Sequence, residues 1–125
     1  MRYMMFIKHP GDYDMSATPP SLYEAMGAFV GEYIQKGMFV DGAGLQPLTK
    51  ATRVRLAGGK ITVTDGPFSE AKEVVGGYSL IEAATHAEAV ELATRFMELH
   101  RLHWPGFEGE CELRPLEDMG EPPHA

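Results

Sequence analysis

The residue best suited to do chemistry is Asp65, which ends an alternating segment and begins a turn. It lies in the run Thr64-Asp65-Gly66-Pro67-Phe68. A carboxylate at the end of a strand, partly removed from water, can act as a general acid or base. An Asp-Gly-Pro sequence is equally typical of a turn in which the carboxylate accepts backbone N–H bonds. The sequence leaves both roles open, and one aspartate can fill both.

Charged residues follow this turn within a few positions. Glu70, Lys72 and Glu73 could supply a cation for an anionic substrate and a second carboxylate, or they could form a solvated cluster of little energetic value. We count Lys72, Glu73 and the aromatic Phe68 among the residues expected to bind a ligand.

Histidines are the natural partners of such a carboxylate. His100 and His103 are spaced i, i+3 and share a helix face if the helix persists that far. They could partner Asp65 or bind a metal, although cations near a helix C-terminus are favoured by its dipole alone. His9, at the end of the first predicted strand, could line the same cavity. We assign no metal ligands and expect no cofactor.

A glycine-rich segment at 42–47 lacks the spacing and the following helix of a phosphate-binding loop. A strand bulge or a close approach of two backbones explains its glycines better. Such a geometry would let Gln46 face a pocket. Tyr78, in a later strand, completes the set of expected ligand-binding residues.

Composition and charge exclude several classes of protein. The chain has 125 residues, 44% of them hydrophobic, which fits one soluble globular domain. Its net charge of −7 and its lack of a basic cluster argue against nucleic-acid binding. No apolar run approaches the roughly 20 residues of a membrane helix, and no signal peptide is recognisable. The single cysteine, Cys111, fits a reducing compartment, so we expect a cytoplasmic protein.

The pattern of apolar residues predicts the elements that must position these side chains. Strands are expected at 2–8, 38–45, 76–82 and 110–114, a hairpin at 52–56 and 60–64, and helices at 22–36 and 86–100. Ser21 or Thr18 should cap the first helix, and Thr85 with Glu88 has the spacing of a capping box for the second. One domain should span 1–116, with a flexible acidic and proline-rich tail at 117–125.

This order of elements predicts an α+β fold. The expected arrangement is ferredoxin-like, one antiparallel sheet with two helices on one face. Apolar residues occur on both sides of the strands, as in Met4 and Phe6 against Met5 and Ile7. A second copy of the chain is the simplest cover for the open face, so we expect a symmetric homodimer packed sheet to sheet.

The segments 64–73 and 76–82 resemble the YCII-related family, specifically its DGPF-domain branch. The segments 42–47, 51–55 and 112–115 extend the resemblance over nearly the whole chain. It implies a ferredoxin-like dimeric α/β-barrel. Most members have no established activity, some resemble enzymes, and some DGPF relatives occur beside or fused to extracytoplasmic-function sigma factors.

The wider family carries a suspected His–Asp pair, with the histidine on the first helix. The aspartate corresponds to Asp65, but the predicted helix at 22–36 contains no histidine. We expect a small organic molecule to bind in a cavity between sheet and helices. Cofactor-independent acid–base chemistry at Asp65 is one hypothesis, and the alternative is a non-catalytic module that binds a ligand or a protein in sigma-factor or stress regulation. Whether the chain is an enzyme stays open at this point.

Overall fold

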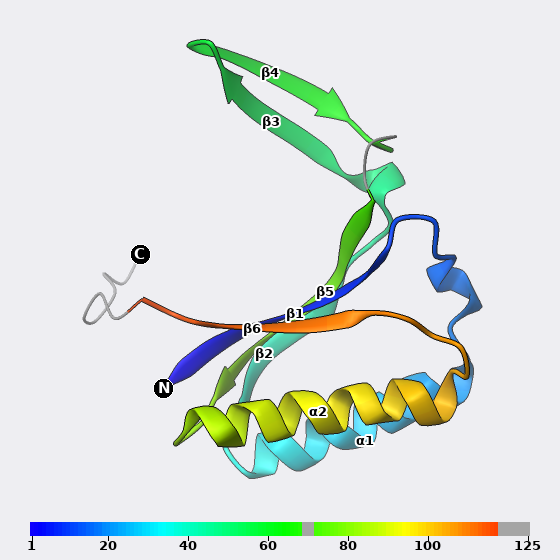
Figure 1. Cartoon of the computed structure of the whole chain (residues 1–125), viewed down its shortest axis with the longest axis vertical. Coiled ribbons are helices and arrows are strands. Elements are labelled where there is room, and N and C mark those ends of the chain that lie inside the picture. Colours follow the sequence, from blue (N-terminus) through cyan, green and yellow to red (C-terminus); the bar gives the residue numbers. More distant parts are fainter. Residues whose placement is uncertain (69–71, 118–125) are drawn as a thin grey trace.

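The computed structural model describes residues 1–68 and 72–117 (Figure 1). The order of strands and helices is the predicted one. Glu70 and the expected tail from 118 onward lie outside the described residues. The elements are β1 (Arg2–Pro10), η1 (Met15–Ala17), α1 (Pro20–Gln35), β2 (Phe39–Gly44), η2 (Leu48–Lys50), β3 (Thr52–Ala57), β4 (Lys60–Asp65), β5 (Glu73–Glu82), α2 (His86–His103) and β6 (Glu110–Pro115), where η marks a short 3-10 helix.

Four strands form one antiparallel sheet in the order β2-β5-β1-β6. Both helices cover the same face of this sheet (Figure 1), which confirms the α+β, ferredoxin-like prediction. Tyr3 and Met5 of β1 and Ile81 of β5 point toward the helices and are at most 1% exposed. They pack in one core with Phe29 of α1 and Leu92 of α2.

The predicted hairpin forms, but it does not join the main sheet. β3 and β4 make a separate two-stranded sheet, which we call the arm (residues 52–65). The arm projects from the body on the side opposite the helices (Figure 1), and every residue of both strands is exposed. The expectation of a single sheet was therefore wrong, because the chain turns away through η2 once β2 has paired with β5.

The two helices begin in different ways. Thr85 caps α2 as predicted, since its hydroxyl oxygen accepts a hydrogen bond of 3.1 Å from the backbone N–H of Glu88. Neither Ser21 nor Thr18 caps α1, which starts at two prolines without a side-chain cap. Proline suits this position because it has no N–H to satisfy and its φ is already helical. Neither helix, within the described part of the chain, is long and apolar enough to cross a membrane.

Replacing Gly42 of β2 and Gly31 of α1 by alanine tests how closely β2 packs on β5. A Cβ on Gly42 would lie 2.8 Å from the carbonyl oxygen of Tyr78, whereas a Cβ on Gly31 would meet nothing within 4 Å. We expect Gly42→Ala to lower the free energy of unfolding by about 1–3 kcal/mol through overpacking. Gly31→Ala should raise it by roughly 0.5–1 kcal/mol, because alanine loses less backbone entropy in a helix. Urea unfolding measures both, and an unchanged midpoint for Gly42→Ala would contradict the close packing of β2 on β5.

Candidate functional site

Asp65 lies at the foot of the arm, opposite Thr52 in the last pair of the β3–β4 ladder. It is exposed, and its carboxylate accepts a 2.9 Å hydrogen bond from the Thr52 hydroxyl. The next backbone N–H, of Gly66, donates to the carbonyl of Ala51 at 2.8 Å. A Cβ on Gly66 would lie 2.0 Å from the carbonyl oxygen of Leu48, so only glycine fits this turn. The hydrogen bonds of Asp65 and Gly66 thus close the base of the arm.

The expected neighbours of Asp65 divide between two surfaces. Phe68 lies under the guanidinium of Arg53, whose central carbon is 3.6 Å from the ring centroid, so Phe68 belongs to the foot of the arm. The backbone carbonyl of Lys72 accepts from the N–H of the residue that follows β1, at 2.9 Å. The carboxylate of Glu73 lies 3.8 Å from the Lys8 ammonium and belongs to the main sheet.

Lys8 is the centre of an ion-pair cluster on the sheet face that points away from the helices. It donates to Glu112 of the neighbouring strand β6 and also faces Glu73. The Glu112 carboxylate raises the pKa of Lys8, and Lys8 in turn lowers the pKa of Glu112. Both charges are stabilised by their partners, so Lys8 is a fixed cation surrounded by acids.

The same face of the sheet holds a half-buried apolar patch. Tyr78 lies opposite Phe6 and Leu80 opposite Met4 in the β1–β5 ladder, and none of the four joins the core beneath the helices. We call these four residues the outer patch. Gln46 is exposed just beyond β2.

Two of the expected histidines, His9 and His100, belong to one cluster of aromatic rings. His9 lies 6.3 Å from Tyr13, and His100 lies 5.0 Å from Phe107, measured between ring centroids. Tyr13 joins the two halves, because it lies 5.3 Å from Phe107 and 5.6 Å from Trp104. The Tyr13 hydroxyl also donates to and accepts from backbone groups of the loop after α2. Nothing in the sequence singles out Tyr13, because it lies in a polar loop without periodicity.

Each histidine is held by a local partner. The Nδ1 of His9 lies 2.8 Å from the carbonyl oxygen of Pro10, and that of His103 lies 3.2 Å from the Ser21 hydroxyl. His100 is buried, and its Nδ1 donates to the carbonyl of Phe96 at 3.0 Å. The structure shows no hydrogen bond from any of these rings to Asp65. Within residues 1–68 and 72–117, no three side chains of the metal-binding types gather at one point.

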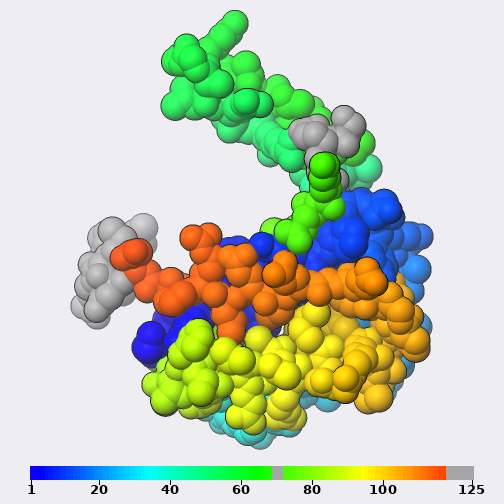
Figure 2. All heavy atoms as spheres, in the orientation of Figure 1, coloured from blue at the N-terminus to red at the C-terminus, as the bar shows by residue number. Residues whose placement is uncertain are grey.

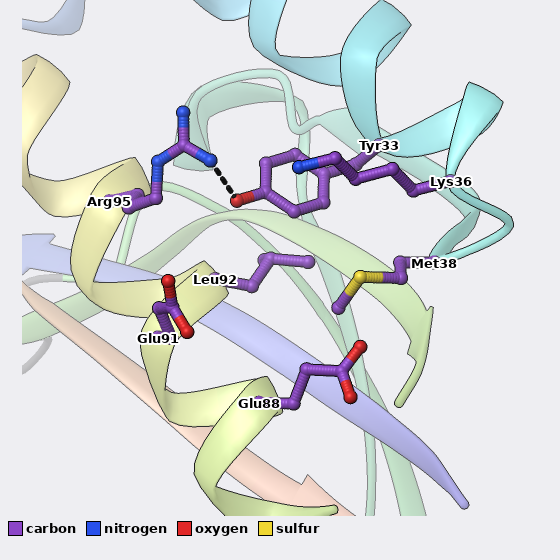
Figure 3. A pocket seen from close by; sticks show the side chains of 7 residues that line it. All are labelled: Tyr33, Lys36, Met38, Glu88, Glu91, Leu92 and Arg95. Atoms are coloured by element: carbon purple, nitrogen blue, oxygen red, sulfur yellow. Dashed lines mark hydrogen bonds between the residues drawn. The ribbon is translucent and has the colours of Figure 1, made fainter. Parts of the chain in front are cut away.

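A cavity of about 210 Å³ opens between the helices, at a place that the sequence did not indicate (Figure 3). Its two sides carry opposite charges, and its floor between them is apolar (Figure 3). The lining residues are Tyr33, Lys36, Met38, Glu88, Glu91, Leu92 and Arg95. They come from the segment 33–38, around the end of α1, and from the segment 88–95 of α2, which lie far apart in the sequence.

Both cations of this interhelical cavity lie near the ring of Tyr33. The Lys36 ammonium lies 4.9 Å from the Tyr33 ring centroid, and the Arg95 guanidinium carbon lies 5.3 Å from it. Arg95 also donates to the Tyr33 hydroxyl and, at 2.9 Å, to Glu32. Hydrogen bonds from Arg95 and Lys36 lower the pKa of Glu32. A guanidinium has five N–H donors, so Arg95 retains donors for a ligand.

The acidic side of the interhelical cavity is formed by Glu88 and Glu91 on α2, with Leu92 and Met38 between the two sides (Figure 3). This arrangement suits a small molecule with an anionic and a cationic group joined by a short apolar stem. It contains no histidine or cysteine, and therefore no group that titrates near neutral pH in its unperturbed state.

A shallow groove of about 570 Å³ runs between α2 and β6 and includes Cys111. Burial raises the pKa of the Cys111 thiol to about 11. The thiol is therefore neutral at physiological pH and is a poor nucleophile.

The chain is similar to known proteins. The chain matches the YCII-related domain over residues 1–96. It is 35% identical over 85 residues to an uncharacterised protein of Rhizobium meliloti (strain 1021). This alignment covers 68% of the chain and 64% of the relative, so the chain spans less than two thirds of that protein's length.

The buried His100 makes stability depend on pH. Burial lowers its pKa below the ordinary 6.5, although the Phe96 carbonyl acts in the opposite direction. As the pH falls through 6.5, the unfolded chain binds this proton before the folded chain does, so the free energy of unfolding falls. The loss is at most about 1.4 kcal/mol per pH unit for one group. Urea unfolding at pH 7.5 and 5.5 should show this loss in the wild type.

His100→Phe should reduce this pH dependence, because it removes the titrating group while keeping a ring between Phe96 and Phe107. His103→Gln, which changes a histidine bonded to Ser21 near the surface, is the matched control and should retain the wild-type dependence. An equal pH dependence in wild type and His100→Phe would show that His100 is not the group responsible.

Proposed function

Because the chain belongs to the YCII-related family, we propose that it is a cytoplasmic, ligand-binding homodimer of the DGPF branch rather than an acid–base enzyme centred on Asp65. One observation supports this choice most strongly. The Asp65 carboxylate is exposed and bonded to Thr52, while His100 is buried against Phe96 and Phe107. An acid–base pair needs its members within hydrogen-bond reach of one substrate.

The interhelical cavity is the proposed ligand site. Its cations, Lys36 and Arg95, face Glu88 and Glu91 across an apolar floor, so the ligand class is a small zwitterion such as a free amino acid. Charge-assisted hydrogen bonds at both ends would fix its orientation. The volume of about 210 Å³ lies below that of most drug-sized pockets, which restricts the ligand to a few heavy atoms.

Ligand binding can be tested by thermal unfolding with a panel of free amino acids at millimolar concentration. A ligand that binds only the folded state raises the midpoint, by the equivalent of about 2.7 kcal/mol at a hundredfold excess over its Kd. Glu91→Gln should weaken the shift by removing one charge from the acidic side. Glu24→Gln, on the exposed surface of α1 and outside the cavity lining, should keep it. No shift with any amino acid would refute this ligand class.

The outer patch supports the homodimer. Its residues, Met4, Phe6, Tyr78 and Leu80, are side chains that the chain itself leaves half-buried on the face without helices. Burying each large aliphatic or aromatic side chain stabilises a folded or associated state by about 1.5–3 kcal/mol. A second sheet packed against the first would remove both patches from water at once.

Leu80→Glu should convert the dimer to a monomer, because it places a charge in the middle of the proposed interface. Sedimentation equilibrium measures the mass, and far-UV circular dichroism checks the fold. Leu102→Glu makes the same change at a side chain on α2 that is 74% exposed, and it should leave the mass unchanged. A wild-type protein that sediments as a monomer at all concentrations would refute the homodimer.

A further inference from the structure

The arm has an apolar face that nothing in the described chain covers. Val54, Leu56, Ile61 and Val63 are between 66% and 71% exposed. In the β3–β4 ladder Val54 pairs with Val63 and Leu56 with Ile61, so all four side chains lie on the same face. A compact aliphatic surface of this kind is typical of an interaction site rather than of ordinary solvent-exposed surface.

Within residues 1–68 and 72–117, the arm also lacks a surface to pack against. An isolated two-stranded hairpin is at best marginally stable in water, and it gains stability by packing on another surface. Figure 2 shows the arm standing clear of the body, with open space between them. Among the described residues, the arm contacts the rest of the chain at its foot, where Arg53 lies over Phe68. The two residues that flank the arm are joined there by the hydrogen bond from Gly66 to Ala51.

We propose that the apolar face of the arm docks on a second copy of this chain, alongside the outer patch. This inference rests on the proposed homodimer and adds a second contact to it. In a two-fold dimer each copy would contribute one arm and receive the arm of the other copy. The apolar face of the arm would therefore be covered in both copies. The arm lies on the side of the sheet where that second copy would sit, opposite the helices (Figure 1).

The distribution of charge favours a second copy as the occupant. Arg55 and Lys60 place positive charge on the arm, on the face opposite its four apolar side chains, in a chain whose net charge is −7. The edge strand β6 carries Glu110 and Glu112, of which Glu112 pairs with Lys8 on the face away from the helices. A basic arm therefore complements the acidic body of another copy. Long basic side chains can reach past the edge of a strand while their stems pack on apolar surface.

The test measures the dissociation constant of the full-length dimer by sedimentation equilibrium. The double variant Val54→Ser/Val63→Ser removes one cross-strand apolar pair from the arm. We expect its dissociation constant to rise by at least about tenfold relative to the wild type. Leu102→Ser, the same type of change at an exposed position of α2, is the control and should leave the constant unchanged.

Hydrogen exchange of the wild-type protein tests the contact without any substitution. Backbone amides of residues 52–65 should be protected at concentrations where the dimer forms, and they should exchange faster after dilution to monomer.

Arg55→Glu should weaken the dimer as well, and added salt should weaken the wild-type dimer, because both reduce the attraction between arm and body. An unchanged dissociation constant in both arm variants, with exchange that does not depend on concentration, would overturn the inference.

The outcomes separate the arm contact from the proposed homodimer. If Leu80→Glu dissociates the dimer and the arm variants do not, the homodimer stands and the arm contact is wrong. If the arm variants dissociate the dimer and Leu80→Glu does not, the arm contact stands and the outer patch is not the interface. A monomeric wild-type protein would overturn both.

Discussion

The alternation of side chains along β1 and β5 is the constraint on which the rest of the structure depends. Tyr3, Met5 and Ile81 point to one face of the sheet, and both helices pack on that face. Successive residues of a strand point to opposite faces, so Met4 and Leu80 must point away from the helices. The chain has no third layer among its described residues. The same strands that build the core therefore also create the half-buried outer patch on the opposite face.

The fold places its titratable groups in separate environments. Asp65 lies at the base of an exposed hairpin, whereas His100 lies among the rings of Phe96 and Phe107 at the end of α2. Water solvates the first and is largely excluded from the second, which is why the pKa of His100 is lowered. A cavity that joins cations and carboxylates forms instead where α1 meets α2. This distribution supports the proposed binding of a small polar molecule.

Local sequence patterns accounted for most of the secondary structure. The period-two alternation of β3 and β4 predicted the hairpin, and the spacing of Thr85 and Glu88 predicted the cap of α2. The start of α1 was less predictable, because two prolines begin the helix without a side-chain cap. No pattern in the sequence indicated the interhelical cavity. Tyr33 and Arg95 belong to different helices, and neither residue has a distinctive neighbourhood in the sequence.

The sequence by itself determined the types and order of the elements, the apolar residues on both faces of the strands, and the lack of a histidine in the first helix. Only the tertiary structure decided that the hairpin leaves the sheet, that Asp65 bonds to Thr52 while His100 bonds to Phe96, and that Tyr33, Lys36 and Arg95 line one cavity. The reason is physical. Periodicity records which side of one element is apolar, whereas the distance between two side chains on different elements depends on how those elements pack.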